Sequence, residues 1–332
     1  MDSSIRHFLD VLTLGEPQTF ENMTVYPLFV PQNGGPAYLV LKEAMEQQLI
    51  SITEVNESGS VPELKVINRS EGFVLLLDGE ELAGAKQNRV LNTSVLLKGQ
   101  SETVIPVSCT ERGRWNYRSA EFQDSDVIMA CRVRSDKVRS VSDSLKRELR
   151  HHSDQGKVWE EIHRMQEQAG VDSATSAMKD VYEARQGKLQ EYLAKFSLLP
   201  AQQGLMVGLD GKVAGMDVLS RAEAFRLVFP KLIKSYAMEA LLEDRKVAAS
   251  QEPDSAAFLA ALTQSQESRF DSPGAGYDYR YEGKELAGSA LAYEGHVIHL
   301  ACFSLEPREK EEPFAGFRRR RDFRRRSGSE EI

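Results

Sequence analysis

The chain has 332 residues, of which 41% are hydrophobic and 28% are charged, and its net charge is −8. These values are typical of a soluble globular protein and exclude a disordered chain, with room for one large domain or two average ones. Three cysteines without metal-like spacing argue against a disulfide framework and for a reducing compartment.

The N-terminal residues are expected to form a short amphipathic helix rather than a signal peptide. Ile5, Phe8, Leu9 and Leu12 recur at helical spacing, and no basic region precedes an apolar core. Nowhere does an apolar run approach the ~18 residues that a membrane helix needs. We therefore expect a cytoplasmic protein of bacterial type without membrane contact.

The first third of the chain is predicted to form strands separated by Gly, Ser, Asn and Pro clusters. One short helix, Lys42–Gln48, is expected among them. Arg89–Leu97 and Glu102–Ser108 are expected to pair as a hairpin around Lys98-Gly99-Gln100. The other predicted strands are Thr24–Val30, Tyr38–Leu41, Ile50–Val55, Glu63–Asn68 and Phe73–Leu77.

Helices dominate the predicted middle of the chain, because apolar residues recur there at helical spacing. The sequence Ser220-Arg221-Ala222-Glu223 is a capping box before a long helix. Pro230 fits that helix only near its start or at a kink. The other predicted helices are 138–149, 158–169, 178–196 and Ala256–Thr263, and the predicted strands are Gly204–Leu209, Lys212–Val218, Lys284–Tyr293 and His296–Phe303.

An acidic residue followed by Gly occurs four times between strand-like runs, at Asp78, Asp210, Glu282 and Glu294. Such a pair is a strong signal for a two-residue hairpin, because both positions tolerate positive φ. The seven residues from Gly79 match those from Gly283 at five positions. This match indicates either an internal duplication, covering 76–97 and 281–303, or convergent hairpin chemistry.

The segment Asp78–Trp115 is the best candidate for a site, because it combines carboxylates, amides and cations with small residues. Strand alternation places Glu81, Ala83 and Ala85 on one side. Lys86 and Arg89 could hold a phosphate or carboxylate, whereas a solvated hairpin with internal ion pairs is the alternative. The predicted ligand-binding residues are Glu80, Lys86, Gln87, Asn88, Arg89, Ser108, Arg114 and Trp115.

Three residues are candidates for catalysis if the protein turns a substrate over, which the sequence leaves open. Glu81 or Glu111 could act as a general base. Cys109 could act as a nucleophile, because nearby positive charge lowers the pKa of a thiol. The alternative for Cys109 is a small buried residue. No metal site is predicted, since His151, His152 and His163 lie at unsuitable spacing, and no cofactor can be named.

Residues 306–332 are expected to form a disordered Arg-rich tail, because they contain too few apolar residues to fold. The stretch Phe317–Arg326 contains seven Arg and one Asp, which leaves about −14 of net charge on the rest of the chain. Arg318–Arg326 is therefore a candidate arm for nucleic acid or another anionic partner. Any such role is auxiliary, because the acidic body repels a phosphate backbone.

Several runs together resemble the bacterial "ARG and rhodanese–phosphatase-superfamily-associated protein" domain. They are Asp78–Arg89, Val107–Trp115, Gln203–Leu219, the helix Pro230–Leu241 and Gly283–Phe303. The resemblance covers roughly residues 5–305. It implies a role near ADP-ribose or nucleotide-derivative metabolism, and it implies no defined activity.

We predict one α+β domain, 1–305, with mainly antiparallel strands from the N- and C-terminal thirds and the central helices packed on one side. Its expected function is to bind or hydrolyse a phosphorylated small ligand such as ADP-ribose or another nucleotide derivative. One alternative is a non-enzymatic module that binds a protein partner. A weaker alternative is nucleic-acid association through the tail.

Overall fold

Strands from both ends of the chain share one large antiparallel sheet, as predicted. The computed structural model describes the chain except for residues 32–33, 57–59, 149, 243–251 and 306–332. The predicted Arg-rich tail therefore lies outside the described residues. The nine-stranded sheet consists of β1 (Thr13–Leu14), β3 (Met23–Phe29), β13 (Gly204–Leu209), β14 (Lys212–Leu219), β18 (His296–Ser304), β17 (Leu286–Tyr293), β16 (Tyr277–Glu282) and β15 (Gln266–Asp271), with β2 (Gln18–Phe20) beside β3.

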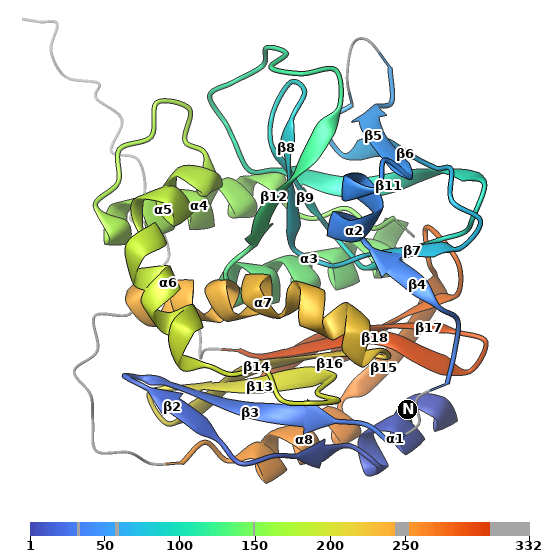
Figure 1. Ribbon diagram of the computed structural model, residues 1–332, viewed down its shortest axis with the longest axis vertical. Helices are drawn as coiled ribbons and strands as arrows, with labels where there is room; N and C mark the ends of the chain where they lie inside the picture. Colours follow the sequence, from blue (N-terminus) through green and yellow to red (C-terminus); the bar gives the residue numbers. More distant parts are fainter. Residues whose placement is uncertain (32–33, 57–59, 149, 243–251, 306–332) are drawn as a thin grey trace, which may run out of the picture.

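Two smaller sheets lie above this one in Figure 1. The three-stranded sheet has the order β10 (Val95–Leu97), β7 (Phe73–Leu76), β4 (Tyr38–Val40), and its β4–β7 pair is parallel. The six-stranded sheet has the order β12 (Phe122–Ile128), β8 (Glu80–Gly84), β9 (Arg89–Leu91), β11 (Ser101–Cys109), β6 (Glu63–Asn68), β5 (Ile50–Glu54). The chain is thus an α+β protein in which antiparallel pairing predominates.

The helices form layers on both sides of the large sheet (Figure 1). α3 and α7 lie between the large sheet and the upper sheets, whereas α1 and α8 cover its lower face. The prediction that the central helices pack on one side is therefore confirmed. The helices are α1 (Ser3–Asp10), α2 (Leu41–Glu46), α3 (Cys131–Glu148), α4 (Gln155–Ala169), α5 (Met178–Ala184), α6 (Gln186–Lys195), α7 (Ala222–Leu242) and α8 (Ser255–Gln264).

The six-stranded sheet curls around its own apolar core. Its outer strands β5 and β12 contact each other, so the sheet approaches a closed barrel. Ile52, Leu64, Ile105 and Leu91 are all fully buried on the inner face, as the strand register requires. The outer face beside β11 and β12 is covered by α4 and α5. Successive residues along these strands therefore point alternately into the apolar core inside the sheet and toward the helices outside it.

Two of the four predicted acidic-Gly hairpins are correct. Asp210 and Glu294 have positive φ, as do the glycines after them, and the flanking residues pair directly. Asp78-Gly79 instead leads from β7 into β8, which belong to different sheets. Glu282-Gly283 begins a longer turn between β16 and β17.

The predicted hairpin of Arg89–Leu97 with Glu102–Ser108 is correct only for its first part, since Val90 and Leu91 pair with Ser108 and Val107. The first of these runs divides into β9 and β10, and β10 pairs with β7 in the three-stranded sheet. The segments 76–97 and 281–303 touch where Ser94 meets His299, at 2.7 Å between Oγ and Nδ1. Their strands belong to different sheets, so an internal duplication stays a prediction.

The turn before β16 fastens the large sheet to the three-stranded one, and Gly276 is essential to its geometry. Ala275 N donates to the Leu96 carbonyl at 2.8 Å. Gly276 has φ +87°, and a Cβ there would lie 2.1 Å from the Ala292 carbonyl oxygen. We expect Gly276→Ala to lower the free energy of unfolding by about 2 kcal/mol or more, measured by urea denaturation. Gly187→Ala is the control.

Gly187 lies in α6 with no neighbouring atom near its added Cβ. The same substitution there should stabilise the protein by up to about 1 kcal/mol, because alanine is the better helix former. Equal effects at the two glycines would contradict the close approach at Gly276.

Candidate functional site

The segment Asp78–Trp115 does not form one cluster, because the curled sheet sends its side chains to different faces. Arg89 pairs with Cys109 across β9 and β11 and points inward. Glu81 and Ser108 both lie opposite Val90 and point outward, beneath the helices. The functional groups that lie close together in the sequence are therefore separated onto two faces of the sheet.

Glu54 and Arg89 form a buried ion pair inside the curled sheet, but their charged groups do not reach hydrogen-bond distance. Arg89 is fully buried, and its Nη2 lies 3.8 Å from Glu54 Oε1. Its Nη1 donates to Gln87 Oε1 at 3.0 Å. Among the described residues, neither Arg89 Nε and Nη2 nor either Glu54 oxygen has a hydrogen-bond partner. Buried charged groups normally satisfy their hydrogen bonds, so this pair is the candidate for contact with a ligand.

Two exposed aromatic rings lie beside Lys86, and one of them, Trp115, also lies over Arg89. Trp115 is 44% exposed and Tyr117 52% exposed. The Lys86 Nζ is 5.4 Å from the centre of the Trp115 ring and 5.1 Å from that of Tyr117. The Arg89 Cζ is 5.6 Å from the Trp115 ring centre. We name Glu54, Lys86, Arg89, Trp115 and Tyr117 the rim cluster.

Cys109 lies beside the rim cluster, in surroundings that disfavour the thiolate on which its predicted role as a nucleophile depends. Burial raises the pKa of its thiol to about 11, although Arg89 acts to lower it. The backbone on both sides of this residue is held by Gln155, which accepts from Cys109 N at 2.7 Å and donates to its carbonyl at 2.9 Å. A thiol with a raised pKa is a poor nucleophile at neutral pH.

On the outer face, Glu81 is a buried carboxyl group with one unpaired oxygen. Thr110 Oγ1 donates to its Oε1 at 2.6 Å, and Oε2 has no hydrogen-bond partner among the described residues. Burial raises the pKa of Glu81 to about 7, since the charged form loses its hydration. Ser108 lies on the same face, where its hydroxyl donates to Asn92 Oδ1 at 2.7 Å and also contacts Ser153.

Glu111 and Arg114 form a closed structural clamp. Their side chains meet at 2.6 Å, and Arg114 also donates to the carbonyl oxygen of Ala85 at 2.7 Å. Glu111 further accepts from Thr175 and from the Asn88 backbone. Burial acts to raise the pKa of Glu111, but its hydrogen bonds outweigh burial and lower it.

Glu80 joins β8 to α7. Its Oε1 lies 2.8 Å from Lys231 Nζ, which also contacts Asp124 at 2.7 Å. Burial acts to lower the pKa of Lys231, but the two carboxylates outweigh it and keep the amine charged. Glu80 therefore lies in a satisfied ion cluster apart from the rim.

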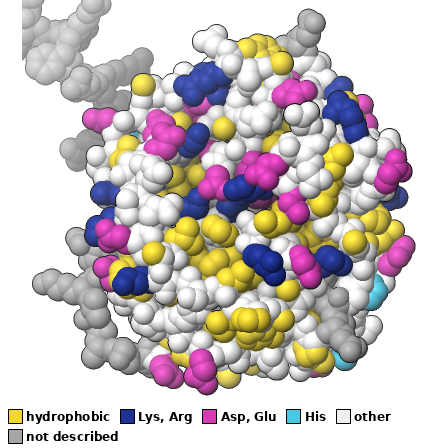
Figure 2. Space-filling model, in the orientation of Figure 1, with side chains coloured by type: hydrophobic (Ala, Val, Ile, Leu, Met, Phe, Trp, Pro, Cys, Tyr) yellow, Lys and Arg dark blue, Asp and Glu magenta, His cyan; other side chains and the backbone are white. Residues whose placement is uncertain are grey.

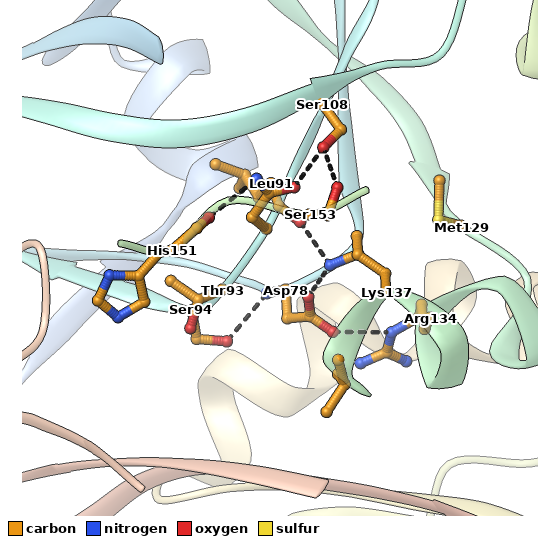
Figure 3. Close-up of polar contacts among 12 residues, drawn as sticks. Asp78, Leu91, Thr93, Ser94, Ser108, Met129, Arg134, Lys137, His151 and Ser153 are labelled. Carbon is orange, nitrogen blue, oxygen red and sulfur yellow. Dashed lines mark hydrogen bonds and ion pairs between the residues drawn. The ribbon is translucent and has the colours of Figure 1, made fainter. Parts of the chain in front are cut away.

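A second buried cluster, which the sequence reasoning missed, links the sheets around Asp78 (Figure 3). Arg134 and Lys137 of α3 both contact Asp78, and the Arg134 Nη2 lies 2.6 Å from Asp217 of β14. Burial lowers the pKa of Lys137 to about 8, although Asp78 favours its charged form. His299 lies 3.4 Å from Asp217 and contacts Ser94.

These interlayer groups resemble parts of a catalytic relay, but they lie between the layers of the fold, where their side chains pair with one another. Ser94, His299 and Asp217 are all less than 4% exposed. Asp217 also accepts from Tyr236 at 2.8 Å. The cluster therefore connects the layers through ion pairs and hydrogen bonds, and its positive and negative charges compensate each other inside the protein.

An open groove of about 480 Å³ lies at the N-terminus of α7, away from the rim cluster. Gln203 in its wall accepts from Val30 N and donates to the Ser220 carbonyl, so its amide is satisfied. The Ser220 hydroxyl, expected in a capping box, pairs with the Tyr38 hydroxyl at 2.8 Å. No buried side-chain polar atom of the described wall lacks a hydrogen-bond partner.

The described residues contain no group of three or more His, Cys, Asp or Glu side chains that could hold a metal ion. His151 pairs with Asp278 at 3.0 Å between Nε2 and Oδ2, whereas His163 contacts Glu167 on the surface. No helix in the described ranges combines the length and apolar character needed to cross a membrane.

Comparison with known proteins gives one informative match. The family model of the ARG and Rhodanese-Phosphatase-superfamily-associated Protein domain, ARPP-1, matches residues 11–303. The search of curated proteins found no match. The search of solved structures found none either. Because the family model covers most of the chain, this protein belongs to the ARPP-1 domain family.

Proposed function

We propose that the rim cluster binds a small phosphorylated ligand with a planar ring, of which ADP-ribose and related nucleotide derivatives are the first candidates. The observation that carries this proposal is the buried Arg89 guanidinium with two unpaired nitrogens beneath the exposed Trp115 ring. Lys86 would contact phosphate, Arg89 would donate hydrogen bonds to the ligand, and Trp115 or Tyr117 would stack on the ring. Gln87 already orients Arg89.

Support for binding is stronger than support for hydrolysis. Glu81 faces Thr110 beneath the helices, and Glu111 is held by Arg114 and Thr175. A general base must reach the proton that it abstracts, and neither carboxylate belongs to the rim cluster. The proposal therefore assigns ligand binding to the rim and leaves no catalytic role to Cys109.

We further propose that the protein binds this ligand in the cytoplasm of a bacterium. All three cysteines are free and buried, which suits a reducing compartment. Nucleotide derivatives are chosen as first candidates because of the resemblance to this family, whose name associates the domain with ARG and rhodanese–phosphatase-superfamily proteins.

A partner-binding surface on the central helices receives less support. The large hydrophobic side chains that are exposed in the described structure are Val61, Val104, Trp115, Tyr117 and Tyr277, and none lies in α3–α7.

Figure 2 shows acidic and basic side chains interspersed on the visible face, without one continuous basic patch. Such a face does not suit nucleic acid, which requires concentrated positive charge.

Thermal denaturation with ADP-ribose tests the proposal. A ligand at a hundredfold its Kd should stabilise the wild type by ~2.7 kcal/mol. We expect Lys86→Met to weaken binding roughly 10-fold or more, because it removes a charge-assisted contact to phosphate.

The matched control is Arg112→Met, which removes a cation from the same loop. Arg112 is exposed and stacks on Trp159, 5.3 Å from its ring centre, rather than on Trp115. It should leave binding unchanged. Absence of any shift with ADP-ribose and ADP in the folded wild type, or equal losses in both variants, would count against the rim as a phosphate site.

A further inference from the structure

Glu54 and Arg89 lie further apart than the partners in the other buried side-chain ion pairs of the described residues, such as Arg134–Asp78 at 3.4 Å. Arg114–Glu111 and Arg134–Asp217 close to 2.6 Å, and Lys231–Glu80 closes to 2.8 Å. The nearest atoms of Glu54 and Arg89 lie 3.8 Å apart, although both side chains are almost fully buried. A purely structural pair gains most by closing to direct hydrogen bonds.

Backbone geometry explains how the two groups face each other. Glu54 ends β5, where Ile50, Ile52 and Glu54 alternate on the inner face. Arg89 begins β9 and points to the same interior from the opposite side of β11. The pair thus presents two unpaired donors, Arg89 Nε and Nη2, and two unpaired acceptors, the Glu54 oxygens.

Only some chemical groups satisfy both partners. A phosphate suits Arg89 but is repelled by Glu54, and an ammonium suits Glu54 but is repelled by Arg89. Two neighbouring hydroxyl groups meet both requirements, since each can donate to the carboxylate and accept from the guanidinium. Carboxylates read sugar hydroxyls in this way in dinucleotide-binding proteins.

Resting on the proposed function, we infer that Glu54 and Arg89 together recognise a vicinal diol of the ligand, such as the 2′,3′-hydroxyls of a ribose. Lys86 then carries the main contact to phosphate, and Trp115 contacts the ring. Glu54 is the specificity-determining residue in this arrangement. Its carboxylate repels a second phosphate at the same position and accepts hydrogen bonds from hydroxyl groups.

The test compares ADP with 2′-deoxy-ADP by quenching of tryptophan fluorescence. The chain has two tryptophans, so Trp159→Phe leaves Trp115 of the rim as the only reporter. In this background ADP should bind roughly 10- to 100-fold more tightly than 2′-deoxy-ADP, because each lost hydrogen bond to a charged group has that effect.

Glu54→Gln should reduce the preference for ADP to less than about threefold, since the amide donates where the carboxylate accepted. The exposed Glu102→Gln on neighbouring β11 is the control and should keep the full preference. Unchanged melting temperature and Trp115 emission will show that both variants fold.

The outcomes separate the two ideas. Equal affinity of folded wild type for both nucleotides overturns the diol inference, because water then satisfies the pair, and leaves the rim site intact. Failure of both nucleotides to quench Trp115 overturns the proposed function and the inference with it. A preference that survives Glu54→Gln overturns the role of Glu54.

Discussion

Replacing Arg134 by methionine is expected to lower the free energy of unfolding by about 3–5 kcal/mol, because it leaves buried charges without their partner. Arg134 is fully buried and contacts Asp217 at 2.6 Å and Asp78 at 3.4 Å. Burial acts to raise the pKa of Asp217, but Arg134 outweighs it and holds that pKa far below its usual range. Without the guanidinium, Asp217 must either stay charged in the interior or take up a proton.

Urea denaturation at neutral pH measures this effect, with Arg139→Met as the control on the same helix. Arg139 is partly exposed and lies 4.0 Å from Asp136, so its loss should cost less than about 1 kcal/mol. Adding Asp217→Asn to Arg134→Met should restore part of the stability, because it removes one uncompensated charge. If Arg134→Met costs no more than the control, the interlayer cluster does not hold the layers together.

Much of the fold could be predicted because local patterns and packing agree. The runs around β3, β13, β14, α4 and α8 have the expected type within a few residues. The antiparallel strands of the two chain ends share a sheet, as their turn signals indicated. Strand partners were harder to predict, since β10 leaves its neighbour β9 to pair with β7, which no local pattern reveals.

The prediction that side chains alternate between two faces was wrong at the end of β8, where the backbone is no longer extended. It placed Glu81, Ala83 and Ala85 on one side, but Ala85 packs in the inner core with Leu82 while Glu81 points outward. Gly84 has φ +131° and Ala85 has φ +37°, so the β8 strand ends there and the period of two is lost.

The missed residues did leave a signal in the sequence. Arg134 and Lys137 follow the same helical spacing as Val138, Val141 and Leu145, and all of them are buried. A charged residue on the apolar stripe of a helix indicates a buried partner elsewhere. Glu54 after Ile50 and Ile52 gives the same signal on a strand. Only the tertiary structure identifies the partners, which come from distant parts of the chain.

Glu81 is expected to make the protein less stable as the pH rises from about 4.5 to above 7. Burial raises the pKa of Glu81 to about 7 in the folded protein from the ordinary 4.5. The folded state therefore binds the proton more tightly than the unfolded state does. This stabilising contribution is fully present below pH 4.5 and is lost as the pH rises through 7, because unfolding then releases a buried carboxylate to water.

The size of this effect is about 3 kcal/mol, since each pKa unit corresponds to about 1.4 kcal/mol. The measurement is the free energy of unfolding of wild type minus that of Glu81→Gln at pH 5 and at pH 8, which cancels contributions from other groups. Glutamine keeps the acceptor for Thr110 and cannot ionise, so the difference should shift by about 3 kcal/mol against the wild type at pH 8. Glu111→Gln should not produce that shift, because hydrogen bonds from Arg114 and Thr175 lower the pKa of Glu111. A difference that is constant between pH 5 and pH 8 would mean that Glu81 is already ionised in the folded protein, with water or another group reaching its unpaired oxygen.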